Sequence, residues 1–212
     1  MWSKILLNPS IKLENSRAIL THISLDHLKP LSEIGLDPRI WTHNPSYCCD
    51  TEEKLKIYIQ DAIKSKQDFT RVSFAVFDKK LNKYGGSSSF YAISEPNKRI
   101  AIGKAFIFIN QIKDIFLGYT WYGIDFQRTG LNASVKSIMY DIAFNTLGCN
   151  RVEFHTDANN AASRAQIQHY GAQLEGIFRK HIVRHNGMLR DTANFSILSH
   201  EYAQQRDRLH ID

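Results

Sequence analysis

Residues 125–148 read DFQRTGLNASVKSIMYDIAFNTLG and join a short polar loop directly to a long segment with helical periodicity. In that segment, apolar side chains recur three or four positions apart, at Val135, Ile138, Met139, Ile142, Ala143 and Leu147. Gly148 is a natural C-terminal stop for such a helix. We therefore predict a helix that begins just after the loop and ends before Gly148.

The loop that precedes this helix has the properties of an anion-binding site. A helix start has unpaired amide groups and partial positive charge, and a preceding loop can aim more amides at the same point. Gly130 would let a ligand approach the backbone, and Arg128 adds positive charge. The spacing is not the Gly-x-x-x-x-Gly-Lys-Ser/Thr pattern of nucleotide-binding loops. From the residues alone, a phosphate-binding loop and an ordinary strand–helix connection both stay open.

Composition limits the class of protein. The 212 residues are 43% hydrophobic and 23% charged, which suits one globular domain. The net charge of +6 indicates either a slightly basic solvated surface or an anionic partner, and no basic helix or stacking motif supports binding to nucleic acid. No apolar run approaches the length of a membrane span, and the N-terminus is too short and broken for a signal peptide. With three cysteines and no metal or disulfide spacing, we expect a cytoplasmic protein.

The rest of the chain alternates between predicted strands and helices. Asp50 and Glu53 have the spacing of a capping box, and Asn186-Gly187 indicates a final hairpin. Two apolar runs, 100–108 and 115–122, are separated by a short polar stretch, and strand–turn–strand is the simplest interpretation. The other predicted strands are 17–23, 71–77, 87–93 and 151–156, and the other helices are 25–35, the segment behind Asp50, and 160–170. This order predicts one α/β domain with a mixed sheet.

The loop also resembles a known motif. Gln127-Arg-Thr-Gly130-Leu-Asn132 is similar to Gln/Arg-x-x-Gly-x-Gly/Ala, the pyrophosphate-binding motif of the GCN5-related N-acetyltransferase (GNAT) superfamily, with Asn at the last small position. That departure is typical of the branch that resembles ribosomal-protein N-terminal alanine and serine acetyltransferases. Further motifs of that branch follow in order, at Asn160-Ala-Ala-Ser163, at 170–176 and at 186–191. The similarity covers residues 11–202, with 1–10 and 203–212 as terminal extensions.

The resemblance implies a fold and a co-substrate. The fold is a mixed, mostly antiparallel sheet flanked by helices, with a splay between the fourth strand, around 119–122, and the fifth, around 151–156. Acetyl-CoA would place its pantetheine arm in that splay and its pyrophosphate on the amides of residues 128–133. No metal is implied. The implied cofactor-binding residues are Tyr119, Thr120, Trp121, Gln127, Arg128, Thr129, Gly130, Leu131, Asn132, Asn160 and Ser163.

The same resemblance suggests an acid but no clear base. Many relatives carry a catalytic Tyr where this chain has Ile167, so Ser163 is the candidate donor to the departing thiolate. The alternative for Ser163 is a residue of the first helical turn that hydrogen-bonds to the backbone. No Glu directly precedes Gly118, where relatives often have the base. The candidate substrate-side residues are His181 and Asp191 on the final hairpin, with His155 and Glu153 as weaker candidates.

We expect an acetyl-CoA-dependent N-acetyltransferase that acts on a primary amine, most readily a protein or peptide N-terminal α-amine. Homodimers are common in the family that it resembles, so the resemblance also suggests a homodimer. Two alternatives stay open: an enzyme for small amines such as polyamines or antibiotics, and a non-catalytic acyl-CoA-binding module. The segment 99–116 is longer than this branch usually has, and an extra hairpin there could reshape the acceptor site.

Overall fold

The computed structural model describes residues 2–11, 13–44, 47–94, 97, 99–102, 120–184, 186–202 and 204. Within these residues, nine strands form one sheet in the order β1-β2-β3-β4-β5-β7-β9-β8, and β6 pairs with β4 beside this path. Every described pairing is antiparallel except that of β5 with β7, which is parallel. The predicted mixed, mostly antiparallel sheet is confirmed. No helix in these residues is long and apolar enough to cross a membrane.

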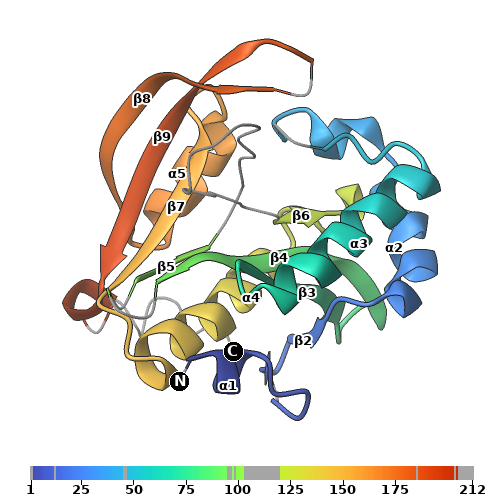
Figure 1. Ribbon diagram of the computed structural model, residues 1–212, viewed down its shortest axis with the longest axis horizontal. Coiled ribbons are helices and arrows are strands. Elements are labelled where there is room, and N and C mark those ends of the chain that lie inside the picture. Colours follow the sequence, from blue (N-terminus) through green and yellow to red (C-terminus); the bar gives the residue numbers. More distant parts are fainter. Residues whose placement is uncertain are drawn as a thin grey trace.

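Two short elements near the N-terminus, a helix at Trp2–Leu6 and a strand at Leu13–Glu14, were not predicted, and after them the elements follow the predicted order along the chain (Figure 1). The strands are β1 (Leu13–Glu14), β2 (Ala18–His22), β3 (Arg71–Asp78), β4 (Lys83–Ser94), β5 (Arg99–Ile102), β6 (Trp121–Tyr122), β7 (Arg151–Asp157), β8 (Gln173–Val183) and β9 (Leu189–Leu198). The α-helices are α1 (Trp2–Leu6), α2 (Leu28–Gly35), α3 (Glu52–Gln67), α4 (Leu131–Tyr140) and α5 (Ala161–His169). The 3-10 helices are η1 (Leu25–His27), η2 (Pro38–Trp41) and η3 (Ile124–Phe126), and η4 (Asp141–Thr146) is a π-helix.

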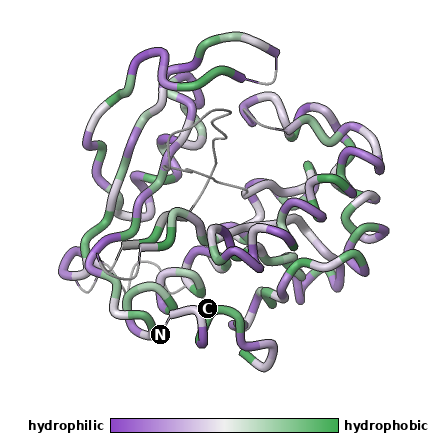
Figure 2. Tube along the Cα trace, in the orientation of Figure 1, coloured by the Kyte–Doolittle hydropathy of each residue, from purple (hydrophilic) through white to green (hydrophobic). Residues whose placement is uncertain are grey.

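The sheet separates two hydrophobic cores. One core joins α1 and α4 to apolar residues of the strands, among them Val152 and Phe154 of β7. The other joins α2, η2 and α3 to Tyr91 of β4 and Trp121 of β6. Figure 2 shows mixed hydrophilic and hydrophobic residues along α2 and α3, as expected for helices that cover one face of a sheet. Alternate residues of a strand point to opposite faces, so β4, β6 and β7 each contribute side chains to both sides.

The two predicted apolar runs occupy one lane of the sheet. Phe90 of β4 pairs with Ile102 of β5, so an uninterrupted strand would place residue 105 opposite Ser87. Trp121 of β6 occupies that place, 16 positions later in the chain. The described ends of the two runs are therefore successive pieces of one strand lane, not neighbouring strands. The residues between them, 103–119, lie outside the described part, and so does most of the segment in which we expected an extra hairpin.

Two helix boundaries show what local spacing can and cannot predict. The expected cap of α3 was wrong by one residue: Thr51 is the N-cap, and its hydroxyl accepts from the Lys54 amide at 3.3 Å. Asp50 instead accepts from the Lys54 ammonium at 2.5 Å, which leaves the cap to the neighbouring hydroxyl. The helix after the loop continues from α4 into η4, and Gly148, with a φ of 64°, follows its end as predicted.

Candidate active site

The loop between η3 and α4 is held in a defined conformation by its own side chains. Gln127 donates from Nε2 to the Tyr122 carbonyl at 3.1 Å, and the Thr129 hydroxyl donates to the Phe126 carbonyl at 2.8 Å. Arg128 and Gly130 have left-handed φ values of 60° and 89°. Nothing lies within 4 Å of the point where a Cβ on Gly130 would lie, so the backbone is open there to a ligand.

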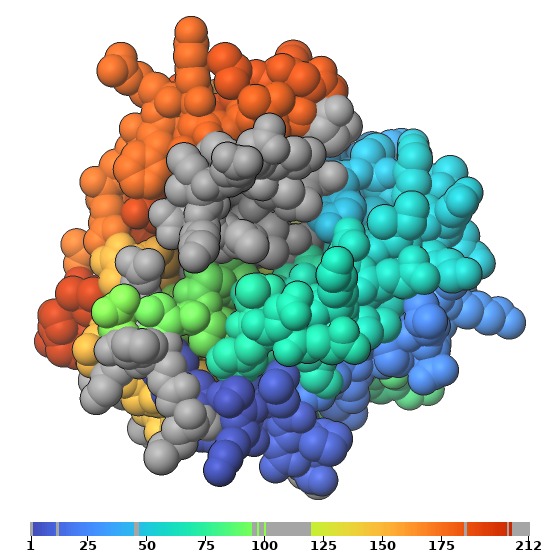
Figure 3. Space-filling view, in the orientation of Figure 1, coloured from blue at the N-terminus to red at the C-terminus, as the bar shows by residue number. Residues whose placement is uncertain are grey.

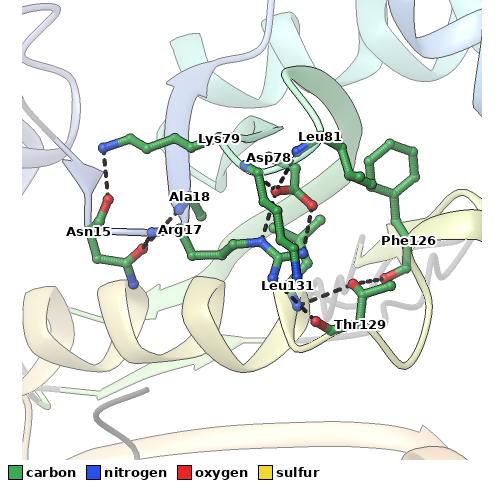
Figure 4. Close-up of polar contacts among 10 residues, drawn as sticks. Asn15, Arg17, Ala18, Asp78, Lys79, Leu81, Phe126, Thr129 and Leu131 are labelled. Carbon is green, nitrogen blue, oxygen red and sulfur yellow. Dashed lines mark hydrogen bonds and ion pairs between the residues drawn. The ribbon is translucent and has the colours of Figure 1, made fainter. Parts of the chain in front are cut away.

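Arg17 braces this loop from the neighbouring strands (Figure 4). Its guanidinium donates twice to the Asp78 carboxylate, at 2.8 Å each, and once to the Thr129 carbonyl at 3.3 Å. Burial alone would raise the pKa of Asp78, yet the hydrogen bonds from Arg17 and from the backbone lower it below its usual value. Since the Asp78 side chain is fully buried, the pair fixes the guanidinium that holds the loop carbonyl.

Several amides of the loop have no acceptor. Within the described residues, the amides of Arg128, Thr129, Gly130 and Asn132 donate to no protein group, and that of Leu131 contacts only the Thr129 hydroxyl, at 3.4 Å. These groups lie at the positive end of α4, and the Arg128 side chain is exposed beside them. Asn132 and Leu131 belong to the first turn of α4. This arrangement fits a diphosphate, the ligand that the family resemblance implies.

The sheet splays next to this loop. β5 and β7 pair only from Arg99 to Ala101, opposite Arg151 to Glu153, and the rest of β7 pairs with β9 alone in the described residues. β6 pairs with β4 through one edge, and no described strand pairs with its other edge. The predicted splay is confirmed in that part of the chain. Thr120 and Trp121 lie on its β6 side, whereas Tyr119 lies outside the described residues.

A buried lysine that the sequence analysis missed lies under β6. Lys136 of α4 is 4% exposed, and its Nζ donates to the hydroxyls of Ser88 and Thr120, at 3.2 Å each. Those two hydroxyls are themselves 2.8 Å apart. Burial lowers the pKa of Lys136 to about 7. One feature of the sequence could have indicated that Lys136 is buried: it stands four positions before Tyr140, so both side chains lie on the same face of α4.

Asn160 and Ser163 lie together at the start of α5. Asn160 is the N-cap, and its Oδ1 accepts from the Ser163 amide at 3.0 Å. The Thr156 hydroxyl of β7 donates to the Ser163 hydroxyl at 2.9 Å. The Ser163 proton therefore stays available to another acceptor, and the residue is half-buried. This geometry is compatible with an acid role for Ser163, while Asn160 has a definite structural role as a cap.

The two residues expected near the acceptor have different surroundings. Asp191 of β9 accepts from the Lys180 amide at 2.7 Å, where β8 is irregular and Lys180 has a φ of 47°. It therefore stabilises the hairpin backbone. His181 is half-buried, and burial is the largest cause that lowers its pKa, followed by electrostatic interactions with His155 and with Arg190. Of the two, His181 is the residue that interacts electrostatically with other titratable side chains, namely His155 of β7 and Arg190 of β9.

A chain of polar contacts runs along β7 from Arg151 through Glu153 and His155 to Tyr91 of β4. Glu153 accepts from the Arg151 Nε at 2.8 Å through one oxygen, and its other oxygen lies 3.5 Å from His155 Nε2. The other ring nitrogen, Nδ1, lies 3.4 Å from the Tyr91 hydroxyl of β4. All three of Tyr91, Glu153 and His155 are buried. Alternation along β7 puts this chain on the sheet face opposite Thr156 and Ser163.

Comparisons with known proteins agree with this geometry. The family model described as "Acetyltransferase (GNAT) domain" matches residues 17–173. The chain belongs to the GNAT acetyltransferase family. This acetyltransferase has no match among curated protein sequences. Among the described residues, no group of three or more His, Cys, Asp or Glu side chains could hold a metal ion.

Solved structures share the fold of this GNAT acetyltransferase. A GCN5-related N-acetyltransferase from Brucella melitensis is 25% identical, with 95% of this chain and 84% of that chain covered and a TM-score of 0.79. RimL, a ribosomal L7/L12 alpha-N-protein acetyltransferase, is 20% identical, with 87% and 91% covered and a TM-score of 0.68. A GNAT-family acetyltransferase from Bacillus anthracis is 16% identical, with 90% and 99% covered and a TM-score of 0.70.

Proposed function

We propose that this enzyme transfers the acetyl group of acetyl-CoA to the N-terminal α-amine of a protein or peptide. The observation that carries the proposal is the set of amides at Arg128, Thr129, Gly130 and Asn132, which donate to no group in the described part of the chain and lie beside a splayed strand at the start of α4. An anion with several phosphates satisfies those amides better than water does, because the helix end adds partial positive charge.

The chain's own residues divide the work of binding. The amides of the loop and the exposed Arg128 would hold the diphosphate, and the open backbone at Gly130 would allow close contact. No described strand pairs with the other edge of β6, where the Tyr122 carbonyl already accepts from Gln127, and the remaining backbone groups of that edge would hydrogen-bond an extended, amide-containing arm. Acetyl-CoA, when bound, supplies an acetyl group activated as a thioester.

Ser163 is the residue we propose as proton donor to the departing sulfur. Its hydroxyl already accepts a hydrogen bond from Thr156, which orients the oxygen and leaves its own proton to be donated. Asn160 holds the Ser163 amide, so the residue is fixed on a rigid helix start. A donor placed in this way stabilises negative charge that develops only during bond cleavage.

The nature of the acceptor follows from the acidity of amines. An α-amine has a pKa of about 8 and a lysine side chain about 10.4, so far more of the α-amine is neutral near pH 7. The sequence has no Glu directly before Gly118, where a strong carboxylate base would be expected from the family resemblance. An enzyme without that base favours the acceptor that loses its proton more easily. The likeness in fold to RimL, an alpha-N-protein acetyltransferase, supports this class.

Two matched peptides test the acceptor class. One has a free N-terminus and no lysine, and the other has a blocked N-terminus and a single lysine. With acetyl-CoA and a thiol-detecting reagent, we expect faster release of free thiol with the first peptide. Faster acetylation of the blocked peptide would contradict an α-amine acceptor. Thiol release with small polyamines but with neither peptide would favour the small-amine alternative, and acetyl-CoA binding without release would favour a binding module.

A further inference from the structure

One hydrogen-bonded contact crosses the splay of the sheet. Tyr91 pairs with Ala101 of β5, which in turn pairs with Glu153 of β7, and this row is the last at which β5 joins β7. Beyond it, the Tyr91 hydroxyl reaches His155 Nδ1 at 3.4 Å. Because His155 is two residues further along β7, the contact spans the point where the strands separate.

The rest of this polar chain is suited to moving a proton. The Glu153 carboxylate lies 3.5 Å from His155 Nε2, so a proton on Nε2 suits that neighbour and leaves Nδ1 to accept from Tyr91. Arg151 holds the second oxygen of Glu153 at 2.8 Å and thereby fixes the carboxylate. A carboxylate on one nitrogen orients an imidazole and stabilises its protonated form.

We propose that Tyr91, His155 and Glu153 form the proton relay that accepts a proton from the amine substrate on the face of the sheet opposite Ser163. This inference rests on the proposed acetyl transfer. An acceptor ammonium has three protons: one passes through the Tyr91 hydroxyl to His155, one reaches the departing sulfur by way of Ser163, and one stays on the new amide. The amine lone pair forms the N–C bond as the C–S bond breaks. His155 then returns its proton to solvent.

Charged and titratable groups of several strands lie around the relay. On its own strand, the Glu153 carboxylate lies beside the His155 ring, and Arg151 donates a hydrogen bond to that carboxylate. From the hairpin, His181 lies close enough to His155 and to Arg190 for both to lower its pKa, after the larger effect of burial. The space-filling view shows the β8–β9 hairpin, in orange, and α3, in cyan, at separate places on the surface (Figure 3). The relay therefore has the Glu153 carboxylate of β7 beside His155 and the Arg190 guanidinium of β9 near Tyr91.

The test uses full-length enzyme, acetyl-CoA and a lysine-free peptide with a free N-terminus. We expect His155→Gln to lower kcat/KM by about 100-fold, the usual contribution of a general base, and Tyr91→Phe to lower it by about 10-fold. We expect Glu153→Gln to lower kcat/KM as well, because the imidazole loses the carboxylate that orients it. The affinity for acetyl-CoA, measured by calorimetry, should not change. His200→Gln, at an exposed position, is the matched control.

The outcomes separate the relay from the proposed function. If the wild-type enzyme acetylates the peptide while Tyr91→Phe, His155→Gln and Glu153→Gln all keep wild-type rates, the relay is wrong and the proposed function stands. Tyr91→Phe removes a single oxygen, so it remains informative where the His155 variant does not fold. If the wild-type enzyme releases no thiol with any amine, the proposed function fails and the relay fails with it.

Discussion

Replacing Lys136 with Met should make the protein more stable near neutral pH. The Nζ of Lys136 is buried under β6 with two hydroxyls as partners. Its pKa falls from 10.5 to about 7, and each pH unit of that difference corresponds to about 1.4 kcal/mol. At pH values below 7, burying this side chain therefore costs the native state about 5 kcal/mol relative to a group with no change in pKa.

The sign of the pH dependence follows from where the proton binds. Between about pH 7 and pH 10.5 the unfolded chain still holds the Lys136 proton and the native state has lost it. The unfolded state binds more protons there, so wild-type stability rises with pH. At pH 7.5 the buried lysine lowers the free energy of unfolding of the wild type by about 4 kcal/mol. The variant is free of this cost but loses two hydrogen bonds, which together contribute about 2 kcal/mol. Lys136→Met should then be about 2 kcal/mol more stable than wild type.

Urea unfolding of both proteins at several pH values between 7.5 and 9.5 measures this effect. The difference in free energy of unfolding should move by about 2–3 kcal/mol in favour of the wild type over that range, which brings the two proteins close to equal stability. Lys56→Met, at an exposed position of α3, controls for the loss of a lysine from the chain. A Lys136→Met difference that stays constant with pH, or a variant less stable than wild type at pH 7.5, would refute the reasoning.

Three further substitutions test the loop and the acid. Gly130→Pro removes an amide and imposes a φ near −65° where the native value is 89°, so calorimetry should show acetyl-CoA binding weakened by at least about 10-fold, and unchanged affinity in a folded variant would reject the site. Ser163→Ala should lower kcat with little change in acetyl-CoA affinity, and an unchanged kcat in single-turnover experiments would leave this residue no acid role. Arg17→Met leaves the buried Asp78 carboxylate without its Arg17 partner, so urea unfolding should show a free energy of unfolding lower by about 3 kcal/mol. Acetyl-CoA binding should also weaken, and wild-type values of both quantities would contradict the bracing role.

Features encoded within a few neighbouring residues could be predicted from the sequence. The helix after the loop, its end near Gly148 and the helix predicted over 160–170 depend on spacing within one or two turns, and all three are confirmed. Thr51 shows the limit of such spacing, because adjacent Asp and Thr are both good caps and tertiary contacts decide between them. Predictions of this kind hold where local interactions dominate.

Features that depend on contacts between distant segments were out of reach. Lys136 reads as a polar helix residue until β4 and β6 are placed over it, and only then does its burial become apparent. His155 had no visible partner in the sequence because Tyr91 lies 64 positions away. The register that puts residues 102 and 121 in one lane is likewise set by pairing with β4, which no local pattern encodes.

The interrupted strand lane gives evolution an unusual degree of freedom. The pairs at Phe90 and Ser87 are three residues apart on β4, so the two ends of the intervening segment are anchored about 10 Å apart. Closing a longer chain between fixed anchors costs little, about 0.6 kcal/mol for each doubling in length. Insertions and deletions between residues 102 and 120 could therefore accumulate without displacing the loop before α4. Substrate preference could therefore diverge among descendants of this gene while the loop that we propose to bind acetyl-CoA stayed the same. Exchanging the segment between these two anchors with that of a relative would be a rational route to new acceptors.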